Sequence, residues 1–183
     1  SAIRWRQPTS WGCASTPPYQ GFTTDQLFEV GARKFAEEDW DEAVRIFDRL
    51  IFADPSAERL VEARMYLARA YFNKKDYLTS VAEFSRILDR HPGHPLAAEA
   101  SLGVCQAFVA LSPHVQRDQS YTIQALNSCE NTLADFPASP VAGTARDLRE
   151  RMQEKLAEKV FIAGDFYFKR KIYNSAILYF DKV

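Results

Sequence analysis

The stretch Asp39 to Pro55, DWDEAVRIFDRLIFADP, decides the fold because its pattern returns thirty-seven residues later. Asp76 to Pro92 reads DYLTSVAEFSRILDRHP, which repeats an aromatic residue, a small residue, a phenylalanine and a proline at equal spacing. The register extends upstream, where Phe35 matches Phe72. Each stretch has apolar residues at helical spacing and predicts a helix that stops before its proline. A period of this size indicates repeated units that bury their apolar faces against each other.

These spacings resemble the tetratricopeptide (TPR) repeat, a pair of antiparallel helices in roughly 34 residues. We therefore expect an all-α fold, a right-handed α-α superhelix of TPR-like helix-turn-helix repeats. A flexible leader is expected over residues 1–22 and the solenoid over residues 23–183. The predicted units span about 23–55, 56–92, 93–137 with a loop insertion at 112–121, and 138–183 with a long first helix and a truncated second one.

Composition and motifs argue against several classes of function. A net charge of −1 gives no basic footprint for nucleic acid. No segment approaches the roughly 20 apolar residues of a membrane span. The chain contains no HExxH, GxxxxGK[ST], GxSxG or GxGxxG motif, so we predict no enzyme and no cofactor. His91, His94 and His114 lack partners at metal-ligand spacing, so they are interpreted as structural residues and no metal site is predicted.

The first helix of each unit supplies the candidate binding residues. Side chains on these helices that do not face the second helix are expected to line a groove for an extended peptide. Arg69 and Asn73 would offer a charge-assisted and an amide hydrogen bond to a carboxylate, and the apolar side chains would bury the peptide's own. The alternative is that the rings pack only between units. The predicted groove residues are Phe28, Ala32, Phe35, Met65, Arg69, Phe72, Asn73, Val104, Ala107 and Phe108.

The third unit carries two further candidates. Arg117, Asp118 and Gln119 in the insertion are predicted to contact a partner; alternatively Asp118 caps the next helix while Arg117 pairs locally. Cys105 and Cys129 fall on the two helices of this unit. Two buried thiols are the commoner arrangement for such residues, and a disulfide in an oxidising compartment is the alternative.

The third-unit insertion and the long charged helix after it carry a more specific likeness, over about residues 24–183. The residues that carry it include Ser112-Pro113, Arg117-Asp118-Gln119, Ala125, Phe136-Pro137, Arg149, Val160–Ala163 and Phe166-Tyr167. In these the chain resembles the BamD family, also called YfiO or ComL. These are the TPR lipoproteins of the outer-membrane β-barrel assembly machinery of Gram-negative bacteria.

The resemblance implies a non-catalytic scaffold at the periplasmic face of the outer membrane. Its implied partners are the barrel-forming subunit, other assembly lipoproteins and the carboxy-terminal segments of nascent outer-membrane proteins. It also implies that a cysteine before the first repeat carries a lipid, the only membrane contact. Cys13 is the candidate for lipidation, and an unmodified thiol is the alternative.

Two other functions compete with this interpretation. One is a generic periplasmic TPR peptide-binding adaptor in cell-envelope organisation, against which the third-unit insertion argues. The other is an accessory domain of a larger enzyme, which would require catalytic sequence beyond Val183.

Overall fold

The computed structural model describes residues 19–56 and 58–183, so Cys13 and most of the predicted leader lie outside the described residues. Within the described residues the chain forms eight α-helices and no strand, as expected for an all-α, TPR-like superhelical fold. The helices are α1 (Thr24–Ala36), α2 (Trp40–Ala53), α3 (Leu60–Asn73), α4 (Tyr77–Arg90), α5 (Ala97–Leu111), α6 (Ser120–Asp135), α7 (Ala142–Lys169) and α8 (Tyr173–Phe180).

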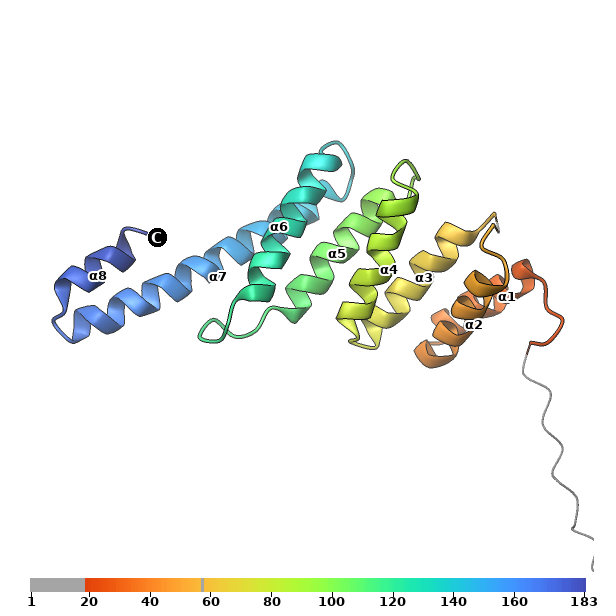
Figure 1. Cartoon of the computed structure of the whole chain (residues 1–183), viewed down its shortest axis with the longest axis horizontal. Helices are drawn as coiled ribbons and strands as arrows, with labels where there is room; N and C mark the ends of the chain where they lie inside the picture. Colours follow the sequence, from red (N-terminus) through yellow and green to blue (C-terminus); the bar gives the residue numbers. More distant parts are fainter. Residues whose placement is uncertain (1–18, 57) are drawn as a thin grey trace, which may run out of the picture.

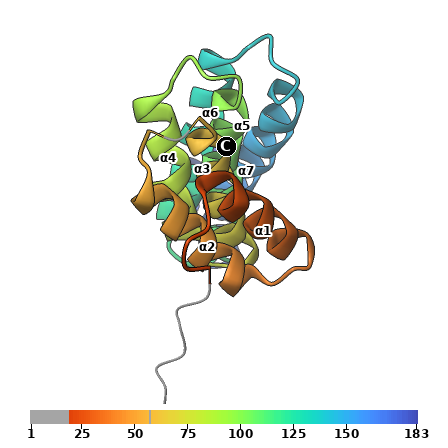
Figure 2. The ribbon, with the colours of Figure 1, turned by 90° about the vertical axis from the view of Figure 1, so that its right-hand side faces the viewer.

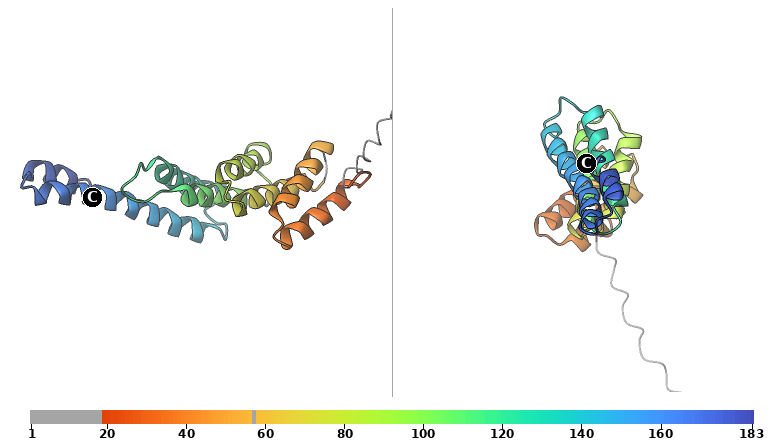
Figure 3. Two further views of the ribbon diagram at one scale, coloured as in Figure 1. Left: turned by 90° about the horizontal axis from the view of Figure 1, so that it is seen from below. Right: turned by 90° about the vertical axis from the view of Figure 1, so that its left-hand side faces the viewer.

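The helices follow one another along an elongated array, with α1 at one end and α8 at the other (Figure 1). Each helix packs on the next, and α1, α3, α5 and α7 also contact one another in sequence, so the first helices of the pairs form one continuous layer. Viewed along the array, the pairs overlap only in part, because α1 and α2 are offset from the helices that follow (Figure 2; Figure 3, right). The α7 helix extends past α6 and carries α8, which packs on α7 alone (Figure 3, left).

The turns inside three of the pairs share one backbone geometry. After α1, Glu38 takes a left-handed φ of 59°, and after α3 and α7 the equivalent Lys75 and Lys171 take 63° and 60°. In each turn two N–H groups donate back to carbonyls of the last helical turn, for example Asp39 to Lys34 at 3.0 Å. This is the Schellman arrangement, which satisfies carbonyl groups that the helix end leaves free. The following helix then starts at Asp39 or Asp76, each of which caps it with a side-chain oxygen.

Phenylalanine rings pack directly on glycine backbone at three places in the array. A Cβ atom added to Gly31 would lie 2.8 Å from the Phe47 ring, and one added to Gly103 would lie 2.6 Å from the Phe84 ring. At the far end, Gly164 meets the Phe180 ring in the same way. Phe47 and Phe84 are almost fully buried, so their rings cannot swing into solvent to make room. The glycines therefore set how closely these helices approach.

A disulfide joins the two helices of the third unit. Cys105 on α5 and Cys129 on α6 are bridged, with their Cα atoms 4.9 Å apart and both side chains buried. The bridge decides between the two arrangements left open by the sequence, and the expectation of buried free thiols was wrong. Because the turn between α5 and α6 is replaced by a long loop, the bridge supplies a covalent constraint where the short Schellman turn is missing.

We expect Gly103→Ala to lower the free energy of unfolding by about 1 to 3 kcal/mol, because added volume in a filled core forces its neighbours apart. The matched control is Gly143→Ala near the start of α7, where an added Cβ would meet nothing within 4 Å. That variant should leave the free energy unchanged or raise it by less than about 1 kcal/mol. Urea unfolding followed by circular dichroism measures both, and equal effects would contradict the close approach at Phe84.

Replacing Cys105 and Cys129 together by alanine should lower the free energy of unfolding by about 2 to 4 kcal/mol, since the bridge restricts the unfolded chain. Reduction with a phosphine should destabilise the native chain by a similar amount and leave the double variant unaffected. The measurement is the urea midpoint with and without reductant. A midpoint that reductant does not move in the native chain would show that the two cysteines are not bridged.

Candidate functional site

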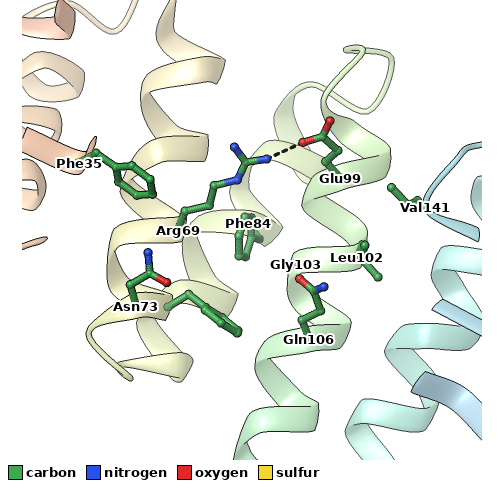
Figure 4. Close-up of a pocket in the computed structure, with 10 residues that line it drawn as sticks. Phe35, Arg69, Asn73, Phe84, Glu99, Leu102, Gly103, Gln106 and Val141 are labelled. Atoms are coloured by element: carbon green, nitrogen blue, oxygen red, sulfur yellow. Dashed lines mark hydrogen bonds and ion pairs between the residues drawn. The ribbon is translucent and has the colours of Figure 1, made fainter. Parts of the chain in front are cut away.

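A groove of about 390 Å³ lies along the first-helix layer and is called here the α3–α5 groove. Most of its lining comes from α3 and α5, with single residues from α1, α4 and the segment before α7 (Figure 4). The volume lies in the range of pockets that hold small ligands or a short stretch of peptide. The lining residues are Phe35, Arg69, Phe72, Asn73, Phe84, Glu99, Leu102, Gly103, Gln106 and Val141.

An ion pair crosses the groove. The Arg69 guanidinium donates to Glu99 Oε2 at 2.5 Å, joining the second repeat to the third (Figure 4). Both side chains are nearly half exposed, so water screens the pair and its net contribution to stability is small. An incoming carboxylate can therefore compete with Glu99 for Arg69 at low cost. The Asn73 amide lies one helical turn further along the same face of α3, beside the groove.

The aromatic side chains that line the groove are held in place by contacts with other aromatic rings. The Phe35 ring packs edge-on against Trp40 and Tyr66, with centroid distances of 4.9 and 5.1 Å. The Phe72 ring packs against Tyr77 at 5.2 Å. Such edge-to-face contacts fix the orientation of a ring, so the remaining half-buried faces form a preformed apolar surface.

Four of the predicted groove residues meet in this groove, namely Phe35, Arg69, Phe72 and Asn73. The prediction for Phe28 and Met65 was wrong, because both are buried in the hydrophobic core at 3% and 2% exposure. Tyr66 and Arg59 from the next unit cover Phe28, with the Arg59 guanidinium 3.4 Å from the centre of its ring.

The other predicted groove residues also pack elsewhere. Val104 packs against the core cluster between α3, α4 and α5, and the Phe108 ring stacks on Tyr121 at 6.5 Å. Ala107 is fully buried, and Ala32 packs against the core of the first pair.

Sequence reasoning missed the half of the groove that α5 supplies. Glu99 lies three and four residues before the neighbours Leu102 and Gly103, and Gln106 lies four and three residues after them, so all four share one face of that helix. Glu99 is the residue from which this half of the groove could have been predicted. It is an acidic residue in the first turn of α5, and the packing of the first helices places it opposite Arg69 on α3.

The third-unit insertion folds back on itself around Gln119. This side chain is 4% exposed, and its amide nitrogen donates to the carbonyl oxygens of His114 at 2.9 Å, Arg117 at 3.1 Å and Val115 at 3.2 Å. Its oxygen accepts from the Thr122 hydroxyl at 2.6 Å. Gln119 is therefore an internal organiser of the loop, and the prediction that it contacts a partner is corrected.

Asp118 makes a local hydrogen bond at the start of α6, where Gln119 occupies the helix cap position. Its Oδ1 accepts from the Ser120 backbone N–H at 3.0 Å, at the start of α6. Hydrogen bonding from Ser120, through its side chain first and its backbone second, holds the pKa of the Asp118 carboxyl below its usual range. The Arg117 and Asp118 side chains are exposed, and contact of either with a partner stays a prediction.

Two lysines of α7 fasten the insertion to the long helix. Lys155 Nζ donates to the Ser112 hydroxyl at 2.7 Å, and Lys159 Nζ donates to the Arg117 carbonyl oxygen at 2.7 Å. The Ser112 hydroxyl in turn lies 2.6 Å from the Thr122 hydroxyl. A continuous set of hydrogen bonds thus runs from α7 through the loop to α6, and the loop braces the fourth unit against the third.

Gln119→Ala should lower the free energy of unfolding by about 1 to 3 kcal/mol, because it leaves several buried polar groups of the loop unpaired. The matched control is Gln116→Ala in the same loop, an exposed residue whose loss should change the free energy by less than about 0.5 kcal/mol. Urea unfolding gives both values, and hydrogen exchange should show residues 112–119 losing protection only in the first variant. Comparable effects would mean that Gln119 does not organise the loop.

Metal-binding and membrane-spanning features are absent from the described part of the chain. No three His, Cys, Asp or Glu side chains gather there as a metal ion would require. None of the helices described is both long and apolar enough to cross a membrane.

The fold and the groove define a TPR-like α-solenoid with a preformed, partly charged binding surface on its first helices. The family model of the YfiO outer membrane lipoproteins matches residues 21–183, and the chain belongs to that family.

Curated relatives agree with this assignment. The outer membrane protein assembly factor BamD of Caulobacter vibrioides is 25% identical over 163 residues, covering 86% of this chain and 53% of its own length. The outer membrane protein assembly factor BamD of Rickettsia prowazekii is 24% identical over 157 residues, covering 86% of this chain and 62% of its own length. The chain thus spans little more than half the length of these relatives.

Solved structures support the fold. PcrH from Pseudomonas aeruginosa matches with a TM-score of 0.52 and 15% identity, covering 79% of this chain and 98% of its own. A thermophilic TPR protein from Thermus thermophilus matches with a TM-score of 0.50 and 17% identity, covering 87% of this chain and 89% of its own. At these identities the likeness concerns the helical repeat architecture.

Proposed function

We propose that this chain is a non-catalytic scaffold of outer-membrane protein assembly that receives nascent outer-membrane proteins in the α3–α5 groove. The relatives named as assembly factors support the process. The observation that carries the binding role is the exposed Arg69–Glu99 pair set between fixed aromatic walls. This arrangement offers one displaceable cation beside apolar surface.

The ligand that fits this groove is an extended carboxy-terminal segment with an aromatic last residue. Its terminal carboxylate displaces Glu99 and takes charge-assisted hydrogen bonds from Arg69, while Asn73 donates to a peptide carbonyl. The aromatic side chain lies against Phe35 and Phe72, whose rings are already oriented and lose little entropy on binding.

A second part of the proposal is docking on the barrel-forming subunit and its companion lipoproteins through the carboxy-terminal helices. Large apolar side chains are exposed there, including Phe166 and Phe168 on α7 and Ile177 and Leu178 on α8. A group of large apolar side chains left exposed at one end of a solenoid supports a site of protein interaction there.

The proposed location is the periplasmic face of the outer membrane, with Cys13 as the site of lipid attachment. The family consists of outer membrane lipoproteins, and its match begins at residue 21, eight residues after this cysteine. The Cys105–Cys129 disulfide supports an oxidising compartment such as the periplasm. A single acyl chain binds membranes only marginally, so stable anchoring at Cys13 requires more than one.

The groove is tested with an N-terminally fluorescein-labelled decapeptide from the carboxy terminus of an outer-membrane β-barrel protein, ending in phenylalanine. Arg69→Ala should weaken its binding roughly tenfold, because a charge-assisted hydrogen bond is lost. Glu99→Gln should strengthen binding, because it removes the competitor for Arg69. Fluorescence anisotropy gives the dissociation constants, and Arg146→Ala on α7, outside the groove, is the control variant.

The same peptide with an amidated carboxy terminus separates charge recognition from apolar binding. It should bind more weakly than the acid and should not distinguish Arg69→Ala from the native chain. Equal affinity for acid and amide would contradict carboxylate recognition by Arg69. Absence of binding by either peptide would favour the generic periplasmic adaptor.

A further inference from the structure

A second cleft lies on the outer side of the array between α2 and α4, and is called here the α2–α4 cleft. These two helices pack on α3 and not on each other, which leaves a furrow between them. The cleft has a main part of about 630 Å³ and an adjoining part of about 260 Å³, which share Asp48, Ile51, Arg64 and Arg90. None of its lining residues belongs to the α3–α5 groove.

The floor of the cleft contains an ion-pair network. Arg64 and Glu83 are nine-tenths buried, and the Arg64 guanidinium donates to Glu83 Oε2 at 2.6 Å. Arg86 reaches the other oxygen of the same carboxylate. Asp48 accepts from the Tyr71 hydroxyl at 3.4 Å. The two carboxylates of the cleft thus already have partners inside the protein.

The arginines of the cleft keep unused donors. Arg90 makes no ion pair or hydrogen bond with the described residues. Arg64 carries five guanidinium N–H groups and makes a single hydrogen bond to the described part of the chain. The unpaired nitrogens of Arg64 keep contact with solvent, and Arg90 is an exposed residue, so both side chains have donors available in the cleft that they line. The cleft is lined by three arginines, Arg64, Arg86 and Arg90, and by two carboxylates, those of Asp48 and Glu83. This excess of positive charge favours the binding of an anion.

The wall of the cleft next to Arg90 is apolar. Ile51, Phe52, Pro55 and Leu60 line it, and Phe52 is 89% exposed, more than any other large hydrophobic residue described. An exposed phenylalanine and an unpaired arginine that line the same cleft fit the enrichment of aromatic and arginine side chains at protein interfaces. Covering such a water-exposed ring with a partner's apolar side chain removes apolar surface from water and stabilises the complex.

We propose that the α2–α4 cleft binds an extended acidic segment of a partner protein. A carboxylate of the segment lies on Arg90 and on the free donors of Arg64, and a neighbouring apolar side chain covers Phe52. A densely charged polyanion fits less well, because Asp48 and Glu83 stand in the floor and repel closely spaced phosphates. The scaffold therefore has two separate peptide-binding surfaces, one on its first helices and one between its second helices.

The probe is a fluorescein-labelled, carboxy-terminally amidated peptide with the sequence Gly-Ser-Asp-Glu-Phe-Leu-Gly-Ser, compared with its Asn-Gln counterpart by fluorescence anisotropy. Amidation removes the terminal carboxylate that the α3–α5 groove would recognise. We expect the acidic peptide to bind roughly tenfold more tightly than the neutral one, and Arg90→Glu to abolish this preference. Phe52→Ser should weaken both peptides. Arg64 is left unchanged, because removing it would leave Glu83 as a buried charge with one partner fewer and would destabilise the fold.

Arg146→Glu on α7 is the matched control, since it changes the net charge equally and lies outside the cleft. It should keep the tenfold preference, as should Arg69→Ala in the groove. The proposal is overturned if Arg146→Glu weakens the acidic peptide as much as Arg90→Glu does, or if Arg69→Ala removes its binding. A third result would also overturn the proposal. In it the acidic peptide does not bind, the native chain sediments with vesicles of phosphatidylglycerol, and Arg90→Glu abolishes that sedimentation.

Discussion

The contact of a phenylalanine ring with glycine backbone is the constraint on which this solenoid depends. At Gly31, Gly103 and Gly164 the facing ring occupies the place that a side chain would need. Because the ring and the backbone touch, the spacing between helices is fixed by two hard surfaces rather than by flexible side chains. The contact at Gly103 joins one unit to the next, and the same ring and glycine line the α3–α5 groove. Packing between units and shape of the binding surface are therefore set by one contact.

Much of the fold follows from sequence because the repeat makes local signals reinforce each other. The helices predicted to stop before Pro55 and Pro92 are α2 and α4, which end at Ala53 and Arg90 and begin after the capping residues Asp39 and Asp76. The groove was harder to predict. Phe28 and Phe35 lie two turns apart on one face of α1, yet Phe28 is covered by residues of the next unit. Helical spacing predicts which face a residue occupies, but contacts between units decide whether that face is open.

The insertion in the third unit illustrates a second limit of sequence analysis. A long polar loop in a repeat protein suggests a binding element. Here much of its hydrogen bonding turns inward, through Gln119 to its own backbone and through Lys155 and Lys159 to α7. The lysines lie more than thirty-five residues further along the chain, so no local sequence pattern predicts their contact with the loop. The Cys105–Cys129 bridge ties the two helices of the third unit together, and the loop ties that unit to the fourth.

The length of α7 has a mechanical consequence. Its 28 residues form an uninterrupted rod of about 42 Å at 1.5 Å per residue. Its first turn follows Val141 at the edge of the α3–α5 groove, its middle is held by the lysine contacts, and its far end carries α8. Packing on α5 and α6 clamps one part of α7, and the part that extends past α6 projects as a cantilever that carries α8. The length of this projection sets how far α8 stands from the groove.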